Sequence, residues 1–83
     1  MPQRSQAHVA LGRAIRAIRR DQRISQEELG FRAGLHRTYV GGIERGEKNP
    51  SYGNLLKVAD ALGVATSQLL RDAEEGRELG DLD

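Results

Sequence analysis

The chain has no cysteine, no tryptophan and only three other aromatic residues among its 83 residues. The absence of cysteine excludes disulfide bonds and thiolate metal sites as sources of stability. With so few aromatics, aliphatic side chains must supply most of the buried area in what we expect to be one small domain. No apolar run is long enough for a membrane span or a secretory signal, so we expect a soluble, cytoplasmic protein.

Signatures of catalysis are also lacking. The sequence has no Ser/His/Asp spacing and no glycine-rich phosphate loop, so we expect no enzyme activity, no cofactor and no small-molecule ligand. His8 and His36 are the only histidines, and they do not have the spacing of a metal site. A binding or interaction module is therefore the favoured class.

The net charge of +1 is small but unevenly distributed along the chain. Residues 1–48 contain ten Arg and Lys against five Asp and Glu, a net charge of +5. Residues 49–83 contain three against seven, a net charge of −4. A basic segment is often only a solvated surface, but this one includes the motif described next. The coincidence favours a surface that faces nucleic-acid phosphates.

The segment SQEELGFRAGLHRTYVGGIERGEKNPS, from Ser25 to Ser51, has the pattern of two short helices joined by a glycine turn. Ser25 and Glu28 have the spacing of a capping box, which starts the first helix. Gly34 supplies the positive φ that ends it. Inward positions at helical spacing are expected at Leu29, Ala33, Val40 and Ile43. This layout predicts a helix-turn-helix with its core at residues 25–45.

Three further helices are expected around this motif, so the fold class is all-α with five helices. A first helix is expected from about Gln6 to Gln22, because Leu11, Ile15 and Ile18 recur at helical spacing. A fourth helix is expected after the break at Pro50, with these residues inward: Leu55, Ala59 and Leu62.

The fifth helix is expected to be short and to contain Leu69 and Leu70. Beyond Gly76 the sequence is acidic and interrupted by glycine. We therefore expect residues 1–75 to form the domain and residues 76–83 to be a frayed tail.

Four stretches together carry a family resemblance: LGRAIRAIRR, SQEELGFRAGL, YVGGIERGEKNPS and LLKVADALGV, about sixty of the 83 residues. The chain resembles the Cro/cI-type (XRE family) helix-turn-helix domain of phage and bacterial repressors. The segment HRTYVGGIERGEKNP further resembles the controller proteins of restriction–modification operons. The resemblance implies a lambda-repressor-like five-helix domain that binds double-stranded DNA, associates with the nucleoid and places its third helix in the major groove.

Base reading is expected from the first turn of the third helix. Arg37 can form a bidentate pair with guanine, which discriminates by about 1–3 kcal/mol. Thr38 offers a hydroxyl and a methyl group to a phosphate or to thymine. Tyr39 is expected to contact a base step or the backbone, with packing against the second helix as the equal alternative.

Two glycines inside the third helix also need a reason, since each costs about 1 kcal/mol relative to alanine. If Val40 and Ile43 point inward, then Gly41 and Gly42 point outward. One explanation is that bare backbone lets the helix lie deep against DNA. The alternative is close packing against the first or fourth helix.

Phosphate contacts are expected on both sides of the recognition helix. Gln26 matches the family position that bonds a phosphate at a helix N-terminus. His36 stands at the expected cap of the third helix, where Ser, Thr or Asp would be favoured, and phosphate contact is its alternative role. Contacts with the DNA backbone are also expected after the helix, from Arg45, Lys48 and Asn49. The alternative is that these three side chains are simply solvated.

The resemblance also implies a partly buried salt bridge between Arg19 and Glu44, which ties the first helix to the end of the third. Phe31 lies off the inward stripe, so both an exposed contact and a satellite core position are open.

A homodimer on a pseudo-palindromic operator is expected, because one such domain reads few bases. Its candidate interface is the region of the fourth and fifth helices, with Val64, Leu69 and Leu70, although these leucines can equally close the core. The alternative function is an antitoxin-type module that binds a partner protein as well as its operator.

Overall fold

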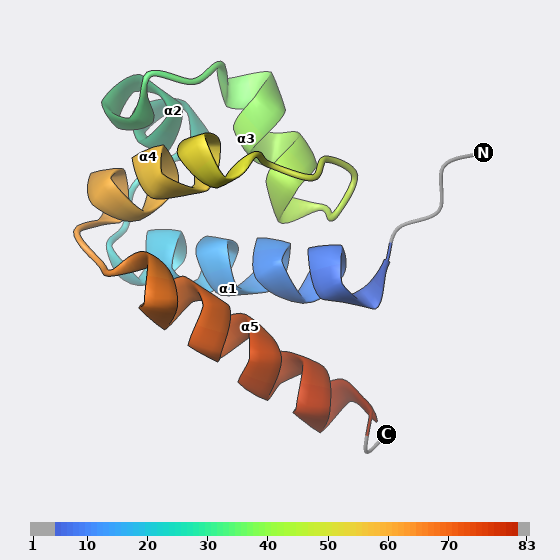
Figure 1. Cartoon of the computed structure of the whole chain (residues 1–83). Coiled ribbons are helices and arrows are strands. Elements are labelled where there is room, and N and C mark those ends of the chain that lie inside the picture. The colour runs from blue at the N-terminus through green and yellow to red at the C-terminus, as the bar shows by residue number, and fades with distance from the viewer. Residues whose placement is uncertain (1–4, 82–83) are drawn as a thin grey trace.

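The computed structural model describes residues 5–81, which form five helices and no strand (Figure 1). Their bounds are α1 Gln6–Asp21, α2 Gln26–Ala33, α3 Arg37–Glu44, α4 Tyr52–Leu62 and α5 Thr66–Asp81. The all-α prediction is confirmed, and the first helix ends within one residue of the expected position. Among the described residues, no helix combines the length and apolarity that crossing a membrane requires.

The capping chemistry explains where the helices start and stop. Ser5, Ser25 and Ser51 stand at the N-caps of α1, α2 and α4, and each hydroxyl accepts a hydrogen bond from the amide three residues on. Gly34 and Gly63 end α2 and α4 with φ of 72° and 70°, a left-handed conformation that glycine adopts without strain. These ends agree with the sequence pattern.

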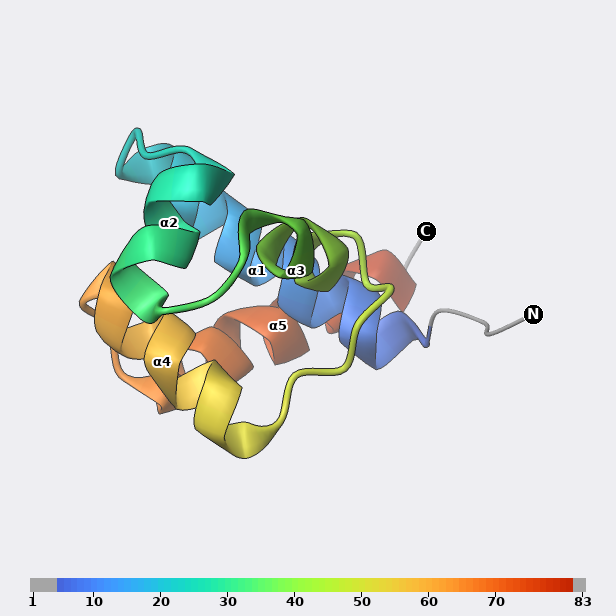
Figure 2. The same ribbon diagram turned by 90° about the horizontal axis from the view of Figure 1, so that it is seen from above.

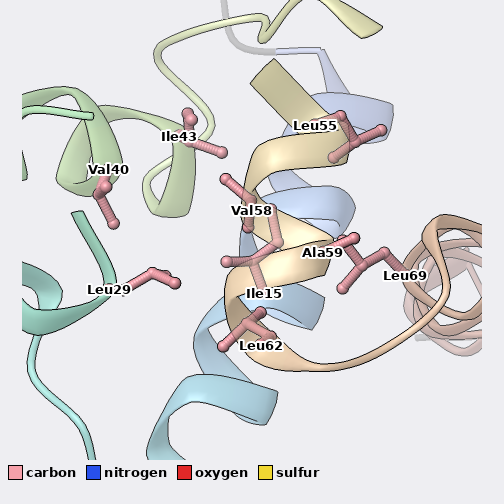
Figure 3. Packing of buried hydrophobic residues seen from close by; sticks show 9 residues of the cluster. All are labelled: Ile15, Leu29, Val40, Ile43, Leu55, Val58, Ala59, Leu62 and Leu69. Atoms are coloured by element: carbon pink, nitrogen blue, oxygen red, sulfur yellow. The ribbon is translucent and has the colours of Figure 1, made fainter. Parts of the chain in front are cut away.

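The helices form two groups that enclose one core. α1 and α5 pack against each other, and α2, α3 and α4 lie over them, so that these three helices are in front when the molecule is seen from above (Figure 2). Nine buried aliphatic residues fill the space between the groups (Figure 3). They are Ile15, Leu29, Val40, Ile43, Leu55, Val58, Ala59, Leu62 and Leu69. The expected inward positions of α2, α3 and α4 are all buried.

The fifth helix departs from the sequence prediction. It is not short: α5 has 16 residues and continues through Gly76 to Asp81. The expectation of an irregular tail from Gly76 is therefore wrong as far as Asp81, while the last two residues of that segment lie outside the described part of the chain. Packing along α1 supports the first turns of α5, and helical hydrogen bonds carry the regular backbone past an exposed glycine.

Candidate nucleic-acid interface

The two helices of the helix-turn-helix are joined by a short, tight turn. α2 and α3 are separated by only three residues, and the Leu35 amide donates to the Gly30 carbonyl oxygen at 2.8 Å. A Cβ on Gly30 would lie 2.6 Å from the Leu35 oxygen, so the turn can fold this tightly only over a glycine. The turn fixes the first residues of α3 relative to the start of α2.

The first turn of α3 presents polar side chains to solvent. Arg37 and Thr38 are exposed, as the sequence predicts for base-reading residues. Arg37 is already engaged, because its Nη1 donates to Glu27 Oε2 at 2.8 Å. Sequence reasoning missed this partner, since it joins two helices through residues ten positions apart. Only the angle between α2 and α3 brings them together.

His36 does cap α3. Its Nδ1 accepts a hydrogen bond from the Thr38 amide at 3.0 Å. This imidazole nitrogen replaces the hydroxyl or carboxylate oxygen that is usual at an N-cap. With Nδ1 as the acceptor, the ring proton is on Nε2, and the side chain is exposed. The expected phosphate contact stays a prediction, and Nε2–H is the donor that would make it.

Tyr39 is half-buried and packs against the hydrophobic core. Its hydroxyl accepts a hydrogen bond from Asn54 Nδ2 of α4 at 3.2 Å. This hydrogen bond anchors Tyr39 to α4, and the core cluster that Tyr39 packs against includes Leu29 of α2, the helix that the sequence suggested. Contact of Tyr39 with DNA stays a prediction.

Gly41 and Gly42 do not present bare backbone, and both are buried. A Cβ on Gly41 would lie 3.0 Å from Arg45 Nη1 and 3.2 Å from Gln26 Oε1, and one on Gly42 would lie 2.7 Å from Lys48 Cγ. The expected outward exposure is wrong, and so is the alternative of packing against α1 or α4. Long polar side chains lie over the glycines and shield the helix backbone.

The residues expected to hold phosphates surround this covered face. Gln26 is half-buried, and its Nε2 donates to Glu44 Oε1 at 3.0 Å, so this amide group is bound to a buried carboxylate of the protein. Arg45 pairs with Glu47 through a 3.1 Å contact from Nε to Oε2. The hydrogen bond that Arg45 donates to the Glu47 carboxylate raises the pKa of Arg45, which therefore stays charged. Lys48 and Asn49 are exposed in the loop that follows. Their phosphate contacts stay predictions.

The expected ion pair of Arg19 and Glu44 is present and buried. Arg19 Nε lies 2.6 Å from Glu44 Oε2, and Nη2 lies 3.0 Å from Oε1, so the pairing is bidentate. Arg19 Nη1 also donates to the Ile24 carbonyl oxygen at 2.8 Å. The pair thus joins α1, the end of α3 and the loop that leads into α2.

The Glu44 hydrogen bond raises the pKa of Arg19, against the opposing effect of burial. A raised pKa in the folded state stabilises the protein at every pH below the unfolded value. That stability is lost only as the pH rises through the raised value, far above neutrality. Arg19 therefore stays charged in any ordinary buffer.

Two expectations about exposed hydrophobic residues are resolved. Phe31 is 83% exposed, which excludes the satellite core position. Leu69 is fully buried in the core and cannot belong to an interface, so that candidate is wrong. It closes the core because it lies one turn into α5, on the side that meets α4. Leu70 is 46% exposed and Val64 is half-buried, so these two stay candidates.

The turn geometry and the sequence pattern match one family model. The model of the helix-turn-helix family covers residues 15–69. The chain belongs to the XRE-type helix-turn-helix family. The match runs from the middle of α1 to Leu69, so it includes the core, the buried ion pair and both helices of the motif.

Two proteins that are similar to this chain are a control protein and a restriction-modification controller protein. The control protein C.BamHI of Bacillus amyloliquefaciens is 47% identical over 60 residues, which cover 71% of this chain and 74% of the relative. The solved restriction-modification controller protein C.AhdI of Aeromonas hydrophila is 43% identical, with a TM-score of 0.78. The match covers 78% of this chain and 98% of that one.

A third relative was solved with DNA. The restriction-modification controller protein C.Esp1396I, a tetramer in complex with its natural 35 base-pair operator, is 26% identical with a TM-score of 0.81. The match covers 88% of this chain and 96% of that one.

Proposed function

We propose that this chain is a sequence-specific DNA-binding transcription regulator of the restriction–modification controller type, which binds a pseudo-palindromic operator as a homodimer. The observation that carries the proposal is the exposed polar first turn of α3, held at a fixed angle in a helix-turn-helix family chain. The similarity to controller proteins, one of them solved on its operator, supports the operator as the ligand. Association with the nucleoid would follow from operator binding.

In this proposal the residues have separate tasks. Arg37 and Thr38 read base edges, and Tyr39 contributes from its position against α4. The N-terminal end of α2 and the loop after α3 contact phosphates, through Gln26, His36, Arg45, Lys48 and Asn49. Phosphate contacts fix the position of the domain on the duplex, and base contacts provide the specificity.

The base-reading role of Arg37 is tested by selecting bound sequences from random DNA and repeating the selection with Arg37→Ala. We expect the variant to lose its preference at one position of each half-site, because a bidentate arginine–guanine pair discriminates by about 1–3 kcal/mol. Salt-sensitive binding should persist, since the phosphate contacts remain. A uniform loss of affinity across all sequences would instead assign Arg37 to the DNA backbone.

Dimer formation is tested at Leu70, which is the most exposed apolar candidate in α5. Two recognition helices about 34 Å apart, or a multiple of that, would read successive major grooves. We expect Leu70→Asp to sediment as a monomer at tens of micromolar and to bind the operator more weakly, with a melting temperature close to that of the parent. Gln68→Glu adds the same charge at an exposed position on the other side of α5 and should leave the dimer intact. A parent protein that sediments as a monomer, alone and with DNA, would exclude the homodimer.

A further inference from the structure

Glu27 is a carboxylate on the surface that we expect to face DNA. It lies in the first turn of α2, where the helix dipole favours a negative charge. That preference does not explain its partner, because Glu28 is in the same turn and pairs within its own helix. Glu28 Oε2 lies 3.6 Å from Arg32 Nε, four residues on. Of these two glutamates, Glu27 is the one that reaches across to α3, where it binds the first residue, Arg37.

Stability does not explain the pair of Glu27 and Arg37 either. The two side chains are 72% and 65% exposed, and ion pairs this open add little to folding. The pair borders an open depression between α2 and α3, lined also by Phe31, Leu35 and His36. Both charged groups are thus accessible to a ligand that approaches the start of α3.

The geometry of the contact leaves Arg37 able to read a base. A guanidinium group has five N–H donors in a planar fork. Glu27 occupies Nη1, at 2.8 Å, and the donors on Nη2 and Nε have no partner among the described residues. One edge of the guanidinium is therefore held by the protein while the other edge is free for guanine.

We propose that Glu27 is a positioning residue that sets operator specificity: it orients Arg37 for base reading and opposes the use of Arg37 as a phosphate clamp. This inference rests on the base-reading role proposed for Arg37. A phosphate bound by Arg37 would lie close to the Glu27 carboxylate, and the two negative charges repel each other, whereas a guanine edge carries no net charge. This repulsion penalises phosphate contact by Arg37 more than base contact, so discrimination increases without any base contact by Glu27.

The test compares dissociation constants for the selected operator and for a random duplex of equal length, over a range of salt concentrations. The proteins are the parent, Glu27→Gln, Arg37→Ala and the double variant, with Glu28→Gln as the control that removes the same charge one residue away. In Glu27→Gln we expect tighter binding to random DNA and a roughly tenfold fall in the operator-to-random ratio, the size of one base contact. The salt slope on random DNA should steepen by about 0.9, the value for one added phosphate contact.

The controls distinguish the contact of Glu27 with Arg37 from the general effect of removing one negative charge. Glu28→Gln should shift both affinities by the same factor and leave the ratio unchanged. In the Arg37→Ala background, Glu27→Gln should no longer alter the operator-to-random ratio. The melting temperature of Glu27→Gln should match that of the parent.

The contrary outcomes are distinct from one another. If Arg37→Ala abolishes a base preference while Glu27→Gln behaves like Glu28→Gln, the role of Glu27 is overturned and the proposed function stands. If Glu27→Gln still lowers the operator-to-random ratio in the Arg37→Ala background, the role of Glu27 is likewise overturned. If Arg37→Ala leaves every base preference intact, the base-reading role itself fails, and the inference about Glu27 fails with it.

Discussion

Glu44→Ala should destabilise the domain by about 3–5 kcal/mol, because it leaves the buried Arg19 guanidinium without its counter-charge. The loss is a large part of the 5–15 kcal/mol that holds a typical domain folded. It should lower the melting temperature by about 15 °C or more. Gln26 loses its acceptor in the same variant, so the start of α2 is loosened as well.

Urea unfolding followed by circular dichroism measures this loss. Glu75→Ala is the matched control, since Glu75 is an exposed glutamate of α5 and its removal should change stability by less than about 0.5 kcal/mol. The double variant Arg19→Met/Glu44→Leu should recover at least half of the loss, because removing both charges removes the unpaired one. Equal stability of Glu44→Ala and the parent would exclude a structural role for the pair.

The second large effect is expected at the crossing of α1 and α3. Gly12 lies where the two backbones touch, and a Cβ there would be 2.3 Å from the Ile43 oxygen and 2.5 Å from the Glu44 oxygen. Both obstacles are main-chain atoms, so no change of rotamer can relieve the clash. Gly12→Ala should therefore cost roughly 3 kcal/mol, toward the upper end of overpacking penalties, despite the better helix propensity of alanine.

Gly76→Ala is a control with the same chemical change and the opposite expected sign. Gly76 also lies inside a helix, but a Cβ there would meet no atom within 4 Å. Alanine should stabilise α5 by up to about 1 kcal/mol through helix propensity alone. Chemical denaturation of both variants gives the comparison, and a stabilised Gly12→Ala protein would contradict the close crossing seen in the structure.

These two positions connect stability to the DNA-binding surface. Gly12 and the Arg19–Glu44 pair both attach α1 to the C-terminal end of α3. The glycine permits close contact of the backbones, and the ion pair fixes the position of one helix along the other. Loss of either should shift α3 relative to α2, so DNA binding should weaken together with folding. The Arg37→Ala variant differs, because it should lose base preference with its fold intact.

Local features of the sequence determined much of the fold. Ser25 and Gly34 marked the start and the end of α2, because capping depends on residues only a few positions apart. Helical spacing likewise identified the buried faces of α2, α3 and α4. The length of α5 was not predicted, because Gly76 indicated a break, whereas the helical hydrogen bonds continue past this exposed glycine to Asp81.

For the candidate site, the sequence by itself determined which residues are polar and lie at the start of α3, since that follows from one helix register. Only the tertiary structure decided their partners: Glu27 for Arg37, Asn54 for Tyr39, and the side chains that cover Gly41 and Gly42. It also placed Leu69 in the core and left Leu70 exposed. The physical reason is range: capping and periodicity act within one helix, whereas burial and pairing depend on the angles at which separate helices cross.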